Sequence, residues 1–169
     1  NTGCAEYFIL SGALLVINVL IVDDSAFMRK AIEIILVKDP AIRVIGQAAD
    51  GFEALSLVEK LKPDVVTMDV EMPRMDGITA VRKIMANFPR PVLMNSSVTT
   101  EGPEVTLKAM EAGAVDFISK PASRVSLDIV RLEEEIREKV KAVARRRPPV
   151  LRHTGISSVP SKTPLRRPA

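Results

Sequence analysis

Three aspartates that each follow an apolar stretch are the residues of this sequence best placed to do chemistry. Asp23 and Asp24 follow residues 18–22, and Asp69 follows residues 64–68. If the two stretches are neighbouring parallel strands, the three carboxylates meet at one edge of the sheet and repel one another. A shared proton or a hard divalent cation with oxygen ligands relieves such repulsion. The spacing therefore predicts a metal site.

A hydroxyl and an ammonium group follow two further apolar stretches. Ser96 comes after residues 91–94, and Lys120 comes after residues 115–118. Together with the carboxylates, these groups could bind a phosphoryl group, whose oxygens need positive charge and hydrogen-bond donors. Each also has a structural interpretation: the paired aspartates could form a turn and a helix cap, and the serine could satisfy backbone groups at a strand end.

The framework that would position these residues is an alternation of apolar stretches with segments of helical periodicity. Five such units with right-handed crossovers predict an α/β fold with a doubly wound, five-stranded parallel sheet and helices on both faces. Ligands of such sheets bind beyond the carboxyl ends of the strands, where the candidate residues lie. Strands are expected near residues 18–23, 42–48, 64–69, 91–96 and 115–118.

Apolar positions repeat with helical spacing in the five segments between and after these strands. Ser25 is a candidate N-cap of the first helix, and Pro63 should stop the second. In the last helix, Glu133 with Arg137 and Glu135 with Lys139 are expected to pair at i,i+4 spacing. The apolar stripes are Phe27, Ala31, Ile34 and Ile35; Leu55, Val58 and Leu61; Ile78, Val81, Met85 and Phe88; Val105, Ala109 and Ala112; Ile129, Leu132, Ile136, Val140 and Val143.

Charge is distributed unevenly along the 169 residues. The first 136 residues carry 14 Lys and Arg against 20 Asp and Glu, net −6, whereas residues 137–169 carry 10 against 1, net +9. The basic end also contains five of the twelve prolines. We therefore expect three parts: an N-terminal extension without a motif (1–17), a folded domain (18–144), and a disordered, basic, Pro-rich linker or tail (145–169).

The sequence also bears on the cellular compartment. The apolar stretch 7–22 is only sixteen residues long and is interrupted by Ser11, Gly12 and Asn18. It is short for a membrane span and lacks the basic flank and cleavage site of a signal peptide. The single cysteine, Cys4, cannot form an internal disulfide. We expect a cytoplasmic protein without membrane insertion.

Four segments in order resemble the motifs of response-regulator receiver domains. The match runs over about residues 18–144 and implies the flavodoxin-like strand order 2-1-3-4-5. Within that superfamily, Ser25-Ala-Phe-Met-Arg29, Glu71 and Gly113-Ala-Val-Asp-Phe117 are most similar to the regulatory domain of the chemotaxis protein-glutamate methylesterase/glutaminase (CheB) family. The four segments are Leu20-Ile-Val-Asp-Asp-Ser25, Met68-Asp-Val-Glu-Met-Pro73 with Met75-Asp-Gly77, Met94-Asn-Ser-Ser97, and Gly113-Ala-Val-Asp-Phe-Ile-Ser-Lys-Pro121.

The resemblance implies a phosphoacceptor and a metal site. Asp69 would accept the phosphoryl group. Asp24, Asp69 and the backbone carbonyl of Glu71 would bind Mg²⁺ (or Mn²⁺), with Asp23 acting through water. An ionised carboxylate in line with phosphorus, with cations on the equatorial oxygens, is what such a transfer requires.

The resemblance also implies roles for three residues around the phosphoryl group. Ser96 would donate to a phosphoryl oxygen and Lys120 would pair with the phosphoryl group or a carboxylate. Phe117 would be the aromatic that rotates when the switch operates, although it could equally be ordinary core.

Two departures from the family pattern stand out. Asn95 occupies a strand position where the family usually has an aliphatic residue, and a buried amide needs hydrogen-bond partners. Glu71 adds a negative side chain at the mouth of the site, where it could slow the approach of a phosphodonor or steady Lys120.

The family implies a histidine kinase as phosphodonor, a methylesterase catalytic domain in the same chain, and chemoreceptors as targets. No Ser, His, Asp set for a hydrolase appears here, so the chain itself is expected to show only phosphoryl chemistry. Two alternatives stay open. One is a receiver for a DNA-binding output, suggested by the basic tail, although that tail has no aromatic residue and we expect no specific nucleic-acid binding. The other is a phosphohydrolase with Asp69 as nucleophile and Glu71 as acid.

Overall fold

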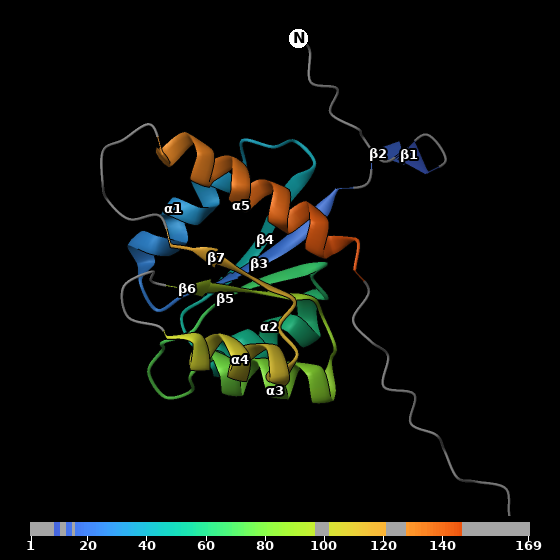
Figure 1. Cartoon of the computed structure of the whole chain (residues 1–169). Helices are drawn as coiled ribbons and strands as arrows, with labels where there is room; N and C mark the ends of the chain where they lie inside the picture. Colours follow the sequence, from blue (N-terminus) through green and yellow to red (C-terminus); the bar gives the residue numbers. More distant parts are fainter. Residues whose placement is uncertain (1–8, 11–12, 15, 97–101, 121–127, 147–169) are drawn as a thin grey trace, which may run out of the picture.

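The structure is a computed structural model that describes residues 9–10, 13–14, 16–96, 102–120 and 128–146. Its centre is a parallel sheet of five strands in the order β4-β3-β5-β6-β7. Counting only these strands along the chain, the order is 2-1-3-4-5, which confirms the predicted topology (Figure 1). The strands are β3 (Ile17–Val22), β4 (Ile42–Ala48), β5 (Val65–Asp69), β6 (Val92–Ser96) and β7 (Asp116–Ser119).

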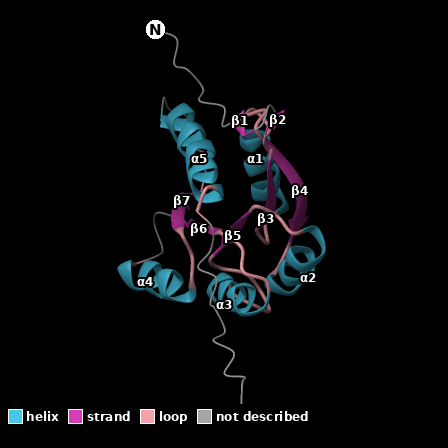
Figure 2. Cartoon of the chain, turned by 90° about the vertical axis from the view of Figure 1, so that its right-hand side faces the viewer, coloured by secondary structure: helices cyan, strands magenta, loops and turns pink. Residues whose placement is uncertain are grey.

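Five helices cover the two faces of this sheet. Helices α1 and α5 lie on one face, and α2, α3 and α4 lie on the other (Figures 1 and 2). Since α1 contacts α5, and α3 contacts both α2 and α4, each face is covered by one continuous layer. The helices are α1 (Ala26–Leu36), α2 (Gly51–Leu61), α3 (Gly77–Asn87), α4 (Pro103–Ala112) and α5 (Asp128–Ala144).

The helix ends follow from local chemistry. The predicted N-cap of α1 is confirmed, because the Ser25 side chain accepts a hydrogen bond from the Met28 N–H. Aspartates cap the next two helices: Asp50 caps α2 and Asp76 caps α3. Helix α2 ends at Leu61, shortly before Pro63, as predicted. These caps satisfy N–H groups that have no partner within the helix.

Two apolar layers form the core, one on each side of the sheet. Alternate residues of β5 divide between them: Val66 and Met68 pack under α2, α3 and α4, whereas Val65 packs under α1 and α5. Every residue of β5 is buried, as expected for the middle of a parallel sheet covered on both faces.

The predicted apolar stripe of α1 was partly wrong. Phe27 and Ile34 are 73% and 49% exposed, whereas Ile32 and Leu36, which the prediction omitted, are buried together with Ile35. The helix presents the 32, 35, 36 face to the sheet, so its stripe is rotated from the predicted one. The prediction also placed Phe88 in the buried apolar stripe of α3, but the Phe88 side chain is exposed.

Helix α5 carries the ion pairs that its sequence predicted. Glu133 pairs with Arg137 at 3.8 Å and Glu135 with Lys139 at 3.3 Å. Lys141 also reaches Asp39, in the connection between α1 and β4, at 3.0 Å. The last contact joins α5 to the segment that follows α1.

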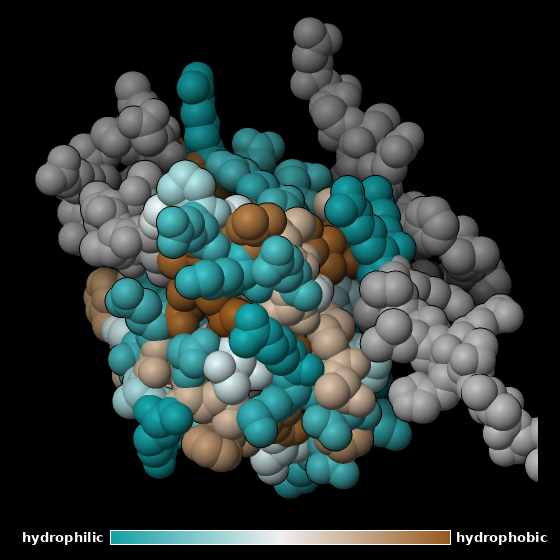
Figure 3. All heavy atoms as spheres, turned by 60° about the horizontal axis from the view of Figure 1, so that its bottom comes forward, coloured by the Kyte–Doolittle hydropathy of each residue, from teal (hydrophilic) through white to brown (hydrophobic). Residues whose placement is uncertain are grey.

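Outside the main sheet, β1 (Ile9–Leu10) and β2 (Ala13–Leu14) form a short antiparallel pair. Most of the predicted basic tail, from residue 147 on, lies outside the described residues. Among the helices that the structure describes, none combines the length and the apolar character needed to cross a bilayer. On the side of the α2, α3 and α4 layer, hydrophobic residues are interspersed with hydrophilic ones (Figure 3), an ordinary protein surface.

Candidate functional site

The three predicted aspartates meet at the carboxyl edge of the sheet. Strands β3 and β5 are parallel neighbours with Val22 opposite Met68, so the residues that follow them lie side by side. Asp23, Asp24 and Asp69 each offer a carboxylate oxygen, and these oxygens lie within 4.8 Å of one another. Asp23 and Asp69 are buried, whereas Asp24 is exposed. Two charged groups are therefore held away from water, and the third faces it.

Lys120 completes the cluster from the end of β7. Its Nζ lies 2.7 Å from Asp69 Oδ1 and 3.3 Å from Asp23 Oδ2. The backbone places it there, because the Lys120 N–H donates to the carbonyl oxygen of Ser96 at 2.9 Å. One ammonium thus faces two buried carboxylates.

Burial raises the pKa of Asp69 to about 6. The ammonium of Lys120 and the Glu71 backbone N–H lower the pKa of Asp69, whereas the charge of Asp23 raises it. Burial alone would lower the pKa of Lys120, but Asp69 and Asp23 outweigh it and raise that pKa. Lys120 is therefore cationic at neutral pH, while Asp69 carries its charge at a cost.

Backbone contacts fix the first two aspartates. The Ser25 N–H donates to Asp23 Oδ1 at 2.9 Å. Arg29 Nη1 donates to the carbonyl oxygen of Asp23 at 2.7 Å and to that of Asp24 at 3.3 Å. Arg29 was not among the predicted site residues. Arg29 lies one helical turn after the Ser25 cap, where its side chain can reach back to the end of β3. This spacing is the signal that could have found it.

A close backbone approach fixes the loop after Asp69. A Cβ atom on Gly77 would lie 1.9 Å from the Asp69 carbonyl oxygen, which no side chain permits. The Gly77 N–H also donates to the carbonyl oxygen of Val70 at 2.8 Å. The start of α3 therefore lies directly against the end of β5.

The remaining predicted residues lie on the strands and the loop next to this cluster. Ser96 is half-buried at the carboxyl end of β6, beside β5. Glu71 is exposed, two residues beyond Asp69. Phe117 is half-buried and packs against the core of the α2, α3 and α4 layer. Its carbonyl oxygen accepts a hydrogen bond from Lys139 Nζ at 2.6 Å, which joins β7 to α5.

Asn95 is a buried amide beside Asp69. It lies opposite Asp69 in the parallel register, so both side chains are on the same face of the sheet. Neither amide atom of Asn95 has a hydrogen-bond partner in the described part of the chain, and the Thr67 hydroxyl also has none. Unpaired polar groups of this kind cost folding free energy.

The donor set fits a hard divalent cation. Carboxylate oxygens are its preferred ligands. Asp23 Oδ2 and Asp69 Oδ1 are buried, and within the described ranges they make no hydrogen bond of good geometry; their charged neighbour is Lys120 Nζ. Buried, closely spaced carboxylate oxygens are groups that a cation would compensate.

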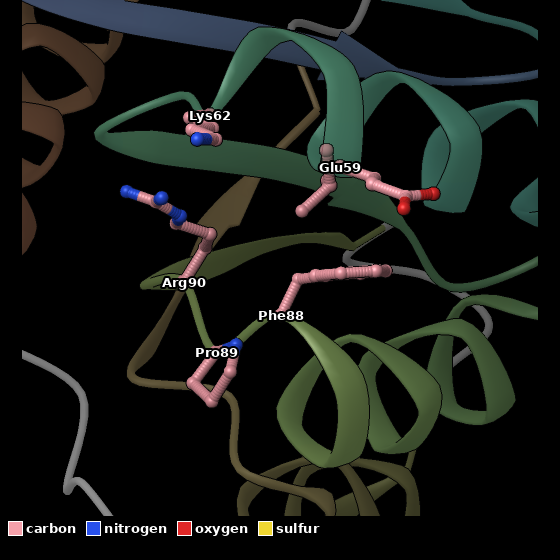
Figure 4. Close-up of a pocket in the computed structure, with 6 residues that line it drawn as sticks. Glu59, Lys62, Phe88, Pro89 and Arg90 are labelled. Carbon is pink, nitrogen blue, oxygen red and sulfur yellow. The ribbon is translucent and has the colours of Figure 1, made fainter.

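A hollow of about 520 Å³ lies elsewhere, between the C-terminal ends of α2 and α3 (Figure 4). Its charged lining residues are Glu59, Lys62 and Arg90. The last two follow helix ends, where cations offset the negative end of the helix dipole. The hollow is therefore separate from the aspartate cluster and needs no ligand to explain its charges.

The receiver-domain family model of response regulators matches residues 19–130, and the chain belongs to this family. The resemblance of the sequence motifs is thereby confirmed. The fold is confirmed as well: the crystal structure of the response regulator domain of Thermotoga maritima CheB aligns with a TM-score of 0.71 and 46% identity, over 79% of this chain and 99% of that one.

Among curated relatives, protein-glutamate methylesterase/protein-glutamine glutaminase 2 of Nitratidesulfovibrio vulgaris is 63% identical over 131 residues, which are 78% of this chain and 36% of the relative. The chain spans about a third of the length of the curated relatives it matches. A CheX–CheY–BeF₃–Mg²⁺ complex from Borrelia burgdorferi aligns with a TM-score of 0.66 and 31% identity, over 79% of this chain and 92% of that one.

Proposed function

We propose that this chain is a phosphorylation-operated switch in which Asp69 accepts the phosphoryl group. The observation that carries the proposal is the arrangement at the carboxyl edge: three carboxylate oxygens within 4.8 Å of one another, and an ammonium 2.7 Å from Asp69. A carboxylate oxygen of Asp69 attacks the phosphorus of the donor. The new O–P bond of an acyl phosphate forms as the bond from phosphorus to the leaving group breaks.

The residues around Asp69 divide this work. Lys120 faces both Asp69 and Asp23, so it can follow the negative charge from the carboxylate to the phosphoryl oxygens. Ser96, at the end of the adjacent strand, donates its hydroxyl to a phosphoryl oxygen. Arg29 holds the backbone of Asp23 and Asp24 in place. The exposed side of the cluster, at Asp24, is where the donor enters.

Mg²⁺ is the cation we assign to the cluster, with Mn²⁺ as a substitute. Asp24, Asp69 and the Glu71 carbonyl would hold it directly, and Asp23 would act through water. When bound, it neutralises charge on the phosphoryl oxygens. The choice is supported by the donor set and by the Borrelia complex of the same fold, which contains Mg²⁺.

The new charge would act on Ser96 and Phe117. A phosphoryl group adds negative charge and acceptor oxygens. These would draw Ser96 towards Asp69 and leave space into which Phe117 can rotate. Phe117 is half-buried, and its carbonyl oxygen is bonded to Lys139 of α5, so a change at β7 would reach α5.

The whole protein would be a chemotaxis methylesterase and glutaminase that this domain regulates. The relatives with that activity are more than half identical to this chain, and the matched residues make up about a third of their length. In this proposal a histidine kinase donates the phosphoryl group and a catalytic domain follows in the same chain. Residues 145–169 would be the linker, chemoreceptors the targets, and the cytoplasm the location.

Acetyl phosphate and Mg²⁺ test the central step. Intact-mass analysis should detect one added phosphoryl group on the wild type and none on Asp69→Ala. Asp39→Asn, which changes a carboxylate remote from the site, should be phosphorylated like the wild type. Equal phosphorylation of wild type and Asp69→Ala, or no dependence on Mg²⁺, would refute the assignment. Sustained release of phosphate over many turnovers would instead favour a phosphohydrolase.

A metal titration tests the ligand set. Asp24→Ala should weaken Mg²⁺ binding more than Asp23→Ala, because a direct ligand contributes more than one that acts through water. The reverse order would mean that Asp23 is the direct ligand.

A further inference from the structure

A second polar contact at the carboxyl edge joins α2 to the loop that follows Asp69. The buried Asp50 accepts hydrogen bonds through Oδ1 from the N–H groups of Phe52 at 2.8 Å and Glu53 at 3.0 Å. Its Oδ2 forms an ion pair with the guanidinium of Arg74, in the loop between β5 and α3. One carboxylate therefore holds the start of α2 and the loop together.

The loop has an unfavourable backbone conformation at Arg74. The Met75 N–H donates to the carbonyl oxygen of Pro73 at 2.7 Å, and Arg74, between them, has a φ of 66°. This is a three-residue γ-turn with a positive φ at its centre, a rare and strained form. Such strain persists only where surrounding contacts enforce it.

Packing next to Arg74 enforces the same placement. Met75 is buried, and a Cβ atom on Gly51, the first residue of α2, would lie 2.7 Å from its sulfur. Only a glycine lets Met75 approach α2 this closely. The loop is thus held by the Asp50–Arg74 pair and the Met75–Gly51 contact, and at its end by Gly77.

We propose that Asp50 and Arg74 are positioning residues for the metal site. Their ion pair holds residues 70–76 in the shape that presents the Glu71 carbonyl to the metal. The inference rests on the proposed function, because it needs a metal at the aspartate cluster. Neither residue touches the reacting atoms. A loop released from α2 would adopt the metal-binding shape for a smaller fraction of the time, and the apparent affinity falls by that fraction.

Calorimetric Mg²⁺ titrations of the full chain test the inference with Asp50→Asn, Arg74→Gln and the double variant. Asn keeps an oxygen to cap α2 but loses the charge that binds Arg74. We expect each single variant to bind Mg²⁺ roughly fivefold more weakly. The double variant should be no weaker than either, because both changes remove one interaction. Arg82→Gln, which removes an exposed arginine of α3, is the matched control and should bind like the wild type.

Arg74→Gly separates the ion pair from the strain of the turn. Glycine adopts a positive φ freely, so this variant should fold as stably as Arg74→Gln or better and still lose Mg²⁺ affinity. At saturating Mg²⁺ the variants should be phosphorylated by acetyl phosphate as fast as the wild type, because the defect lies in metal affinity.

If the ion pair is merely structural, its removal will lower the free energy of unfolding of the metal-free protein and leave Mg²⁺ affinity unchanged. That result would overturn the inference. So would a phosphorylation rate that excess Mg²⁺ does not restore. If the wild type binds Mg²⁺ and accepts phosphate while the variants bind equally well, only this inference fails. If the wild type binds no Mg²⁺, the proposed function fails with it.

Discussion

In two aspartate–lysine pairs of similar geometry, the pKa of the aspartate is shifted in opposite directions. Asp69 and Lys120 lie 2.7 Å apart at the carboxyl edge of the sheet, and Asp39 and Lys141 lie 3.0 Å apart where the connection after α1 meets α5. Burial raises the pKa of Asp69 to about 6. Burial also acts on Asp39, but the Ala41 N–H and Lys141 outweigh it and the pKa of Asp39 is lowered.

The difference comes from the depth of burial and from the neighbours of each carboxylate: Asp69 is buried, whereas Asp39 is half-buried. Asp39 receives a backbone hydrogen bond of 2.9 Å from Ala41 and faces a lysine that it shares with the exposed Glu138. Asp69 shares its lysine with Asp23, which is buried beside it and carries the same charge. The first pair stabilises the fold. The second places two buried carboxylates beside one lysine, which does not favour folding. Such arrangements are common at sites that bind a cation or a reactant.

Removing Lys120, the lysine that Asp69 and Asp23 share, should have the largest effect on the free energy of unfolding. Lys120→Met leaves two buried carboxylates without a counter-charge and should lower the free energy of unfolding by about 3 kcal/mol in metal-free buffer. Lys141→Met, the matched change at the other pair, should cost less than about 1 kcal/mol. Urea unfolding at neutral pH measures both.

Mg²⁺ distinguishes the two losses further. A cation at the aspartate cluster should restore part of the stability of Lys120→Met, because a ligand that binds only the folded state stabilises that state. It should not restore Lys141→Met. Equal losses in the two variants, with or without Mg²⁺, would mean that the two pairs are energetically alike.

Neutralising Asp69 should stabilise the fold, whereas removing Lys120 should destabilise it. Asp69→Asn should raise the free energy of unfolding by on the order of 2 kcal/mol at pH 8, because a shift of the pKa from 3.8 to about 6 opposes ionisation in the folded state. The gain should develop as pH rises from about 4 to 6 and stay constant above. Unfolding measured across this range without metal tests it; a loss of stability at pH 8 would contradict the raised pKa.

The sequence was sufficient for the fold and for the membership of the cluster. The parallel sheet and the meeting of Asp23, Asp24, Asp69 and Lys120 follow from the apolar stretches, the residues at strand ends and the rule that carboxyl ends of parallel strands share an edge. The strand order came from the resemblance to receiver domains.

What the sequence could not supply depends on packing between distant segments. The rotation of α1, which exposes Phe27 and buries Ile32, is set by its contacts with the sheet and α5, because several apolar stripes were available on that helix. The Asp50–Arg74 pair joins residues 24 apart with no periodic signal. The raised pKa of Asp69 depends first on its own burial in the folded chain and then on the charge of Asp23 beside it.

A smaller effect is expected beneath the site. Asn95→Leu should raise the free energy of unfolding by about 1 kcal/mol, because an apolar side chain of similar size removes a buried amide that has no partner within the described residues. Phosphorylation of Asp69 should persist, since Asn95 is not part of the proposed machinery. Chemical unfolding and intact-mass analysis check the two parts. A loss of stability would show that the amide is satisfied in solution.

The smallest effect concerns the structural pair and its pH dependence. The pKa of Asp39 is lowered, so its contribution is present above the unfolded pKa and is lost as pH falls through the folded one. The pKa of Lys141 is raised, so its contribution is present below the unfolded pKa and is lost as pH rises through the folded one. Asp39→Asn should therefore cost roughly 0.5 kcal/mol at every pH from about 5 to 9, and progressively less below about pH 4. Asn keeps an oxygen for the Ala41 N–H, which confines the change to the charge. Urea unfolding of both proteins at several pH values, in low and high salt, would measure it. A gain in stability that develops as pH rises from about 4 to 6, as expected for Asp69→Asn, would remove the distinction between the two pairs.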